Sequence, residues 1–190
     1  MGTTNQGTVL LVMDIQKKMM EFNPNPAPLL ANIEKVVAGA RAANITVVYV
    51  VLGFRPGYPD INPVNKNFAA IRESGGLFIA GSEGAEIHPA AAPLPEDIIV
   101  TKKRISAFAG SDLDIVLRSL KAEQLIITGY ATSGIVLNTV REAADKDYSL
   151  IVLSDGCADS DQETHEFLMT KIFPRQAEIK TTAEWLATIG

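Results

Sequence analysis

The sequence predicts an α/β protein with three layers, in which six strands alternate with helices. The clearest pattern runs from Leu125 to Asp155. An apolar run over Leu125–Ile127 is broken by Thr128 and Gly129, and a second apolar run over Leu150–Leu153 ends at Asp155. Between them, apolar residues recur at helical spacing: Val136, Val140, Ala143 and Ala144. This pattern is typical of one strand–helix–strand unit, whose crossover should be right-handed.

Length, charge and cysteine content bound the function. We expect the 190 residues to form a single domain spanning 1–190. The 17 basic and 22 acidic residues give a net charge of −5, which argues against nucleic acid or an anionic membrane as a partner. One cysteine leaves no disulfide framework, and no signal peptide or membrane-length apolar run is evident. We therefore expect a cytoplasmic protein with a small-molecule substrate.

The remaining elements follow in order along the chain. Strands are expected at Thr8–Met13, Ile45–Val51, Ile98–Thr101 and Ala177–Lys180, of which the first two are expected to be buried and the last is short. The stretch Asn23–Pro28 reads as a rigid loop because of its prolines. Helices are expected over Leu29–Ala43, Asn65–Ser74 and Thr182–Ile189, and from Ser111 or Asp112 through Leu120. A further helix is expected from Ser160 or Asp161 to Pro174, with Phe167, Leu168 and Ile172 facing the core.

Charged residues stand where three of these strands end. Asp14 follows the first strand, and it is either a cap or turn residue or a catalytic acid or base, because a buried carboxylate needs a partner. Arg55 follows the second strand in the segment Phe54–Pro59, where it could bind a substrate carboxylate or form an ordinary ion pair. Lys102 closes the third strand.

The turn from Gly129 to Ile135 lies at the fourth strand's carboxyl end. In open parallel sheets ligands bind at this edge, and the free N–H groups of a helix's first turn point toward it. The turn is therefore expected to line a site together with Asp14 and Lys102.

These residues resemble the isochorismatase-like hydrolase superfamily, which also contains nicotinamidases and N-carbamoylsarcosine amidases. The resemblance rests on Asp14 after VLLVM, on Lys102 four residues before Ser106-Ala107-Phe108, and on the motif GYATSG at 129–134. It implies a parallel sheet in the order 3-2-1-4-5-6 and a non-proline cis peptide at Tyr130–Ala131. For amidase members it also implies an Asp–Lys–Cys triad.

The sequence departs from that triad. The nucleophilic cysteine would stand seven positions into the motif that begins at Gly129, and that position is Ile135. Isochorismate-cleaving members also lack this cysteine, and are held to use the aspartate as an acid toward the enol ether carbon before water attacks. Cys157 could replace the nucleophile, with His165 nearby in sequence, but a buried structural cysteine and a core or interface histidine are the expected readings.

No metal or other cofactor is expected. The nicotinamidase members carry an Asp-x-His motif and a further histidine after the second strand, where this chain reads GFRPGYPD. The chain has two histidines, far apart in sequence, and no CxxC.

Three hypotheses remain open. The first is a hydrolase acting on a small molecule, which could be anionic, with Asp14 as general acid/base and Lys102 orienting it. The second is a binding or interaction module that has lost its chemistry, and the third is an amidase using Ser133, Thr132 or Cys157. A homodimer or homotetramer is expected. The expected substrate-binding residues are Arg55, Phe54, Tyr130, Ala131, Thr132, Ser133 and Gly134.

Overall fold

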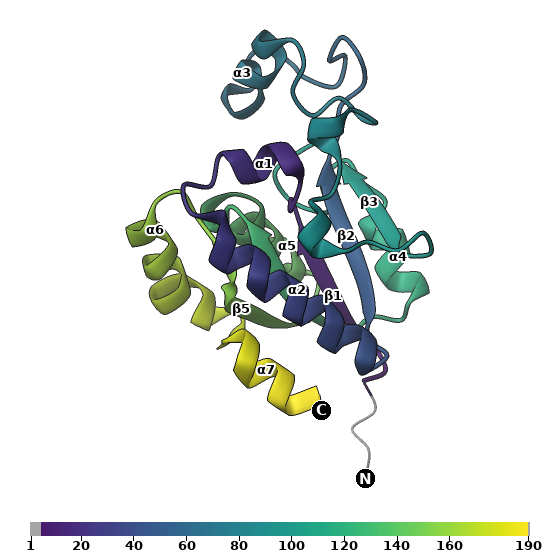
Figure 1. Cartoon of the computed structure of the whole chain (residues 1–190), viewed down its shortest axis with the longest axis vertical. Coiled ribbons are helices and arrows are strands. Elements are labelled where there is room, and N and C mark those ends of the chain that lie inside the picture. Colours follow the sequence, from purple (N-terminus) through teal and green to yellow (C-terminus); the bar gives the residue numbers. More distant parts are fainter. Residues whose placement is uncertain (1–4, 190) are drawn as a thin grey trace.

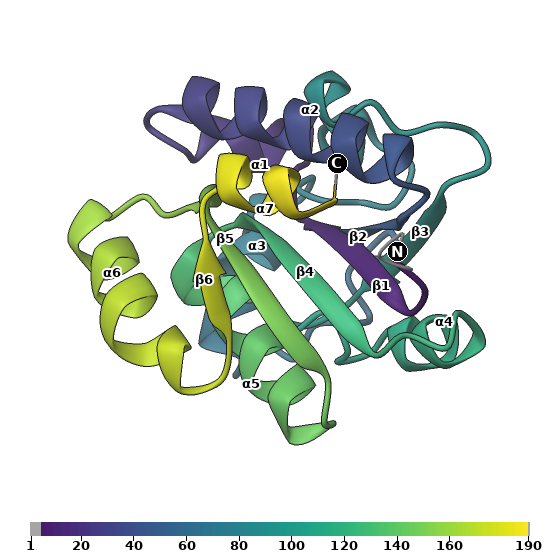
Figure 2. The ribbon, with the colours of Figure 1, turned by 90° about the horizontal axis from the view of Figure 1, so that it is seen from below.

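The computed structural model describes residues 5–189 and contains a sheet of six parallel strands. The strands lie in the order β3-β2-β1-β4-β5-β6, which confirms the predicted three-layer fold (Figure 1) and strand order (Figure 2). The strands are β1 (Thr8–Met13), β2 (Thr46–Leu52), β3 (Ile98–Lys102), β4 (Gln124–Tyr130), β5 (Ser149–Ala158) and β6 (Glu178–Lys180). The predicted domain spans 1–190, of which residues 1–4 and 190 lie outside the described part.

Helices cover both faces of the sheet. The helices are α1 (Lys17–Glu21), α2 (Pro26–Ala42), α3 (Lys66–Ser74), α4 (Leu113–Ser119), α5 (Leu137–Asp145), α6 (Gln162–Phe167) and α7 (Thr182–Ile189). Figure 2 shows α2 and α7 on one face, with α4 and α5 on the other. No helix among the described residues is both long and apolar enough to cross a membrane.

The core is divided by the sheet because successive strand residues point to opposite faces. On β1, Leu10 and Val12 pack with residues of α2 and α7, while Leu11 and Met13 pack with residues of α4 and α5. Both sets are fully or almost fully buried. This explains why the central strands are apolar throughout rather than alternating.

Two local predictions were wrong. The prolines of 23–28 do not all lie in a loop, because α2 begins at Pro26. Proline is tolerated in the first turn of a helix, where its missing N–H has no intrahelical partner to lose. Phe167 was expected in the core but is 55% exposed. At that residue α6 passes into a wider π-helical turn, Leu168–Ile172, and Leu168 and Met169 are the residues that turn inward.

Two further elements differ from the expected pattern. The short helix α1 was not predicted, and β5 runs on to Ala158 instead of ending near Asp155. The β4–β5 register shifts between Ile127 and Gly129, so that Gly129 pairs with Cys157. A separate apolar cluster forms beyond the ends of the central strands, where Phe54, Tyr58, Phe68 and Phe78 pack together near α3.

Candidate functional site

Asp14 and Lys102 form a buried ion pair at the carboxyl edge of the sheet. Strand β2 separates β1 from β3, so the long lysine side chain reaches past one strand to the carboxylate. Lys102 Nζ lies 2.9 Å from Asp14 Oδ2. The exposed fractions are 4% for Asp14 and 2% for Lys102. The two residues therefore lie together, as the sequence analysis expected. Either charge buried without the other would be strongly destabilising.

The two oxygens of Asp14 differ in their surroundings. Oδ2 binds the ammonium, whereas Oδ1 is buried and has no hydrogen-bond partner within residues 5–189. Burial raises the pKa of Asp14, and the neighbouring Lys102 opposes part of that rise. Lys102 also donates to the Arg104 carbonyl at 3.1 Å, which orients its head group. The carboxyl group therefore has one oxygen fixed by the ammonium and one without a hydrogen-bond partner among the described residues.

Glycine at position 129 lets β4 approach β1 directly beside Asp14. Gly129 has φ of +152°, and a Cβ atom there would lie 2.5 Å from the Met13 carbonyl oxygen. Any side chain would push the strands apart at the residue that precedes Asp14. The register confirms this closeness, since Met13 pairs with Gly129.

The turn after β4 is held from the side of β5 and α6. It forms a wide turn over Thr132–Val136, ahead of α5, whose helical path is broken by the non-helical backbone of Gly134. The Ser133 backbone N–H donates to Asp159 Oδ2 at 2.7 Å. The Thr132 hydroxyl lies 2.8 Å from His165 Nδ1. The Tyr130–Ala131 peptide bond is cis, as the family resemblance implied.

Ile135 occupies the position where a nucleophile would stand. Its side chain is buried and belongs to the core cluster that includes Val136 and Val140. Tyr130 is also buried, and its hydroxyl donates to the Phe22 carbonyl at 2.8 Å. The site therefore combines a charged pair with an apolar wall.

Arg55 and Phe54, which were expected to bind substrate, both have other partners in the structure. The Arg55 side chain is 69% exposed and forms an ion pair with Asp60 of its own loop. Phe54 is fully buried against Tyr58 and Phe68. A substrate carboxylate would have to draw Arg55 away from Asp60.

Cys157 is buried on β5, with its thiol 3.7 Å from the Ile127 carbonyl. Burial raises the pKa of the thiol, so the thiolate that nucleophilic chemistry needs is disfavoured. His165 is partly buried, and burial lowers its pKa. Its hydrogen bond to Thr132 fits the expected reading of a satisfied structural histidine.

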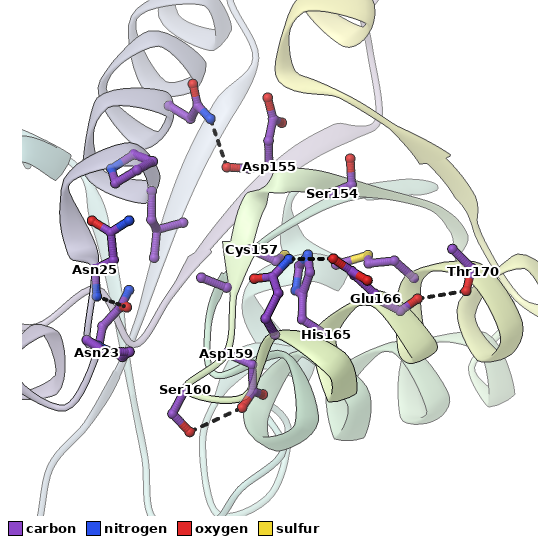
Figure 3. A pocket seen from close by; sticks show the side chains of 17 residues that line it. Asn23, Asn25, Ser154, Asp155, Cys157, Asp159, Ser160, His165, Glu166 and Thr170 are labelled. Carbon is purple, nitrogen blue, oxygen red and sulfur yellow. Dashed lines mark hydrogen bonds between the residues drawn. The ribbon is translucent and has the colours of Figure 1, made fainter.

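A pocket of about 510 Å³ lies beside this region, at the end of β5 (Figure 3). It is bounded by the loop before α2, by the last residues of β5 and by α6. Of the candidate residues, only Cys157 and His165 are among the described residues that line it. Within the described part of the chain, no group of three or more His, Cys, Asp or Glu side chains is arranged to hold a metal ion.

Two residues that shape the site were not singled out from the sequence. Gln16 is fully buried, and its amide binds both the N–H and the carbonyl of Leu52 and also the Ala85 carbonyl. Asp159 holds the Ser133 N–H. A polar residue two positions after a strand-end aspartate was a usable signal for Gln16. No sequence signal connects Asp159 with Ser133, because they meet only through the fold.

The three-layer parallel sheet and the buried Asp14–Lys102 pair at its carboxyl edge define the class as isochorismatase-like α/β hydrolases. The family model described as the isochorismatase domain matches residues 8–184. The chain therefore belongs to the isochorismatase family.

Two relatives show the breadth of that family. The uncharacterized isochorismatase family protein YwoC of Bacillus subtilis is 30% identical over 192 residues, which cover 100% of this chain and 99% of YwoC. The ureidoacrylate amidohydrolase RutB of Pantoea ananatis is 33% identical over 175 residues, covering 81% of this chain and 70% of RutB.

Solved structures agree with the fold. A cysteine hydrolase from Pseudomonas syringae pv. phaseolicola superposes with a TM-score of 0.89 at 26% identity, covering 100% of this chain and 95% of that one. An isochorismatase family protein from Burkholderia thailandensis superposes with a TM-score of 0.87 at 26% identity, covering 99% of this chain and 98% of that one. The N-carbamoylsarcosine amidase of Thermoplasma acidophilum shares the fold, with a TM-score of 0.74 at 22% identity over 92% and 96% of the two chains.

Proposed function

We propose that this chain is a hydrolase that cleaves a small molecule by general acid–base catalysis at Asp14, without a cysteine nucleophile. The substrate could be anionic, since Lys102 and, after release from Asp60, Arg55 are cations near the sheet edge. The observation that supports the proposal is the buried Asp14–Lys102 pair, in which one carboxyl oxygen is fixed and the other has no partner within the described residues.

The environment of Asp14 suits a proton donor. Because burial raises its pKa, the carboxyl group keeps its proton to higher pH than an exposed aspartate does. In vinyl ether hydrolysis, that proton would go to the enol ether carbon, and water would attack the resulting oxocarbenium ion while returning a proton to Asp14. The hemiketal so formed would then break its C–O bond to give a carbonyl compound and the leaving alcohol. Lys102 would hold Oδ2 in place, which leaves Oδ1 to face the reacting atom. This division of roles follows the general rule that environment sets which carboxylate acts as acid.

The surroundings of Ile135 and Cys157 favour a reaction that uses no thiolate nucleophile. Ile135 has no nucleophilic atom and is packed into the core. Cys157 is buried, with a raised pKa. A covalent thioester route would need a reactive thiolate at one of these positions.

A second candidate is an amidase that uses a hydroxyl. Relatives named ureidoacrylate amidohydrolase motivate C–N hydrolysis as an alternative reaction. The Thr132 hydroxyl lies within hydrogen-bond reach of His165, the geometry of an activated nucleophile, although the Thr132 side chain is fully buried. Ser133 is exposed, but its described contact is through the backbone N–H. A binding module without chemistry is the remaining alternative, and Ile135 is the residue that favours it.

The test is turnover on a panel that contains vinyl ethers and small amides. Asp14→Asn keeps the shape and removes the ionisable group, so we expect a loss of about 10²–10⁴ in rate. Asp97→Asn is the matched control, because Asp97 also pairs with a cation, Arg41, on another part of the molecule. It should leave turnover unchanged.

Folding must be checked, since breaking a buried pair can cost about 3–5 kcal/mol. The double variant Asp14→Asn with Lys102→Met removes both charges and restores a neutral interior. If folded Asp14→Asn turns over at the wild-type rate, the acid–base mechanism is wrong. Loss of activity in Thr132→Val, with Asp14→Asn unaffected, would select the amidase. No turnover in the wild type, with saturable binding of panel members, would select the binding module.

A further inference from the structure

The pocket at the end of β5 is separate from the Asp14–Lys102 pair and has its own polar lining. Figure 3 shows Asn23 and Asn25 on one wall, and His165 and Glu166 across from them. The residues that line this pocket include Asn23, Asp155, Asp159, His165 and Glu166. Its volume of about 510 Å³ lies within the range of small-molecule sites.

One buried donor in this pocket is left without a partner. Asn23 is only 6% exposed, and its Oδ1 accepts from the Asn25 backbone N–H at 3.0 Å. That bond fixes the amide orientation, so Nδ2 is the atom that remains. Nδ2 is buried and has no hydrogen-bond partner among the described residues. Such a group is costly unless something with an acceptor atom occupies the space beside it.

The opposite side of the pocket is acidic. Asp155, Asp159 and Glu166 line it, and none of the described lining residues is lysine or arginine. Asp155 accepts from Thr182, and Asp159 accepts from Ser133 through Oδ2 and from Ser160 and Asp161 through Oδ1, so these two residues act mainly through their charge. Glu166 accepts from Gln162 through Oε1, which leaves its other oxygen available. Burial lowers the pKa of His165, so the imidazole adds no positive charge at neutral pH.

We propose that this pocket is a second small-molecule site, which binds an organic cation that also carries a carbonyl group, the chemistry of amino acids and their amides. The carbonyl oxygen accepts from Asn23 Nδ2, and the cationic nitrogen faces Glu166 and Asp159. The site goes beyond the proposed hydrolase activity, because Asp14 and Lys102 do not line the pocket.

The experiment is isothermal titration calorimetry of the whole chain with three related cations and one neutral amide. Argininamide carries cationic groups and an amide carbonyl, agmatine lacks the carbonyl, and arginine replaces the amide by a carboxylate. Pentanamide has the carbonyl without the charge. We expect argininamide to bind at millimolar concentration or below, about fivefold tighter than agmatine because of one additional hydrogen bond. Pentanamide should not bind measurably. Rising salt concentration should weaken the binding of the cations, because it screens their attraction to the carboxylates. The ratio of the dissociation constants of arginine and argininamide decides whether the natural ligand is an amino acid or an amide.

Two variants divide the two contacts. Glu166→Gln should weaken the binding of argininamide and of agmatine to the same extent, by about two- to fivefold. Glu163→Gln is the matched control, because Glu163 is an exposed residue of the same helix that is not among the described pocket residues. Asn23→Asp keeps the acceptor for Asn25 and removes the donor, so the preference for argininamide over agmatine should disappear.

Three results would overturn the proposal. They are no heat of binding with argininamide, binding of pentanamide as tight as that of argininamide, and equal weakening by Glu163→Gln and Glu166→Gln. Should Asn23→Asp fail to fold, the comparison of Glu166→Gln with Glu163→Gln still decides, because both positions are exposed.

Discussion

At the scale of single residues, Asp14 sets an expectation for pH. Burial raises its pKa above the ordinary value of 3.8, against a smaller opposing effect of Lys102. The proton-donating form is thus complete at low pH and is lost as pH rises through the raised pKa. Because the proposal makes Asp14 the donor, kcat/KM should fall with rising pH across that range.

The pH dependence can be separated from unfolding. Circular dichroism at each pH shows where the fold persists, and the rates are compared only there. The residual activity of Asp14→Asn should lack the descending limb. A wild-type profile that rises with pH through the same range would contradict the assignment of Asp14 as the acid.

Ile135 should matter for packing and pocket shape, not for proton transfer. Ile135→Ala deletes buried apolar volume and is expected to cost about 2–5 kcal/mol in unfolding free energy. Turnover should persist, with altered substrate preference. Ile115→Ala is the control, because Ile115 is 68% exposed and should change stability little. Urea unfolding measures the first effect, and the substrate panel measures the second.

Cys157 gives the third expectation at this scale. Its thiol is buried and its pKa is raised, so it should take no part in the chemistry. Cys157→Ser is expected to keep turnover within a few-fold of the wild type. Complete loss of activity in a folded Cys157→Ser protein would instead revive an amidase that uses this cysteine.

Sequence reasoning located some of these residues and missed others for physical reasons. Asp14 and Lys102 stand out because a charge directly after a buried apolar run is costly without a partner, and each then points to the other. Asn23 does not stand out, because its unpartnered donor exists only once α2 and β5 have come together. Arg55 remained ambiguous, since the sequence does not show that Asp60 would pair with it.

At the scale of elements, His165 connects α6 to the turn before α5. Burial lowers its pKa below 6.5, while Asp159 and Glu166 oppose this in part. A histidine with a lowered pKa contributes stability that is present above the unfolded value and is lost as pH falls through the folded value. Acidification should therefore loosen α6 before the central strands.

Hydrogen exchange at neutral and mildly acid pH measures this loosening. Amides of α6 should lose protection at the lower pH, and His165→Gln should remove most of that difference. His88→Gln is the matched control, since the chain has two histidines and His88 lies beside the 3₁₀ turn Pro89–Ala91. Equal pH sensitivity of α6 in wild type and His165→Gln would exclude the assigned role.

Element boundaries were less predictable than element types. Apolar runs identify every strand except β6, because central parallel strands are buried on both faces, whereas β6 is a short, partly exposed strand at the sheet edge. The start of α2 at Pro26 and the exposed Phe167 depend on how a helix end meets its neighbours, which periodicity does not describe. The length of β5 likewise depends on the register shift opposite Gly129.

At the scale of the whole molecule, we expect a homodimer or homotetramer with closed symmetry. The surface carries several large apolar side chains that a partner could cover: Phe22, Val64, Leu94, Ile99, Ile115 and Phe167. Light scattering at micromolar concentration should give a multiple of the 20.4 kDa chain mass. A monomer mass under those conditions would reject the expectation. The strand order itself came from the family resemblance, because apolar patterning identifies strands without ordering them.

The single cysteine, buried on β5 where that strand pairs with β4, makes the chain its own reporter of opening. Cys157 lines the pocket at the end of β5 but is only 4% exposed, so a thiol reagent needs a local opening of that pocket to react, and the labelling rate in native buffer measures this opening. Because the chain has no other cysteine, every labelled molecule records that one event. A ligand that occupies this pocket should slow the labelling in proportion to its occupancy. Chemical modification thus offers a binding assay that needs neither a substrate nor a spectroscopic signal.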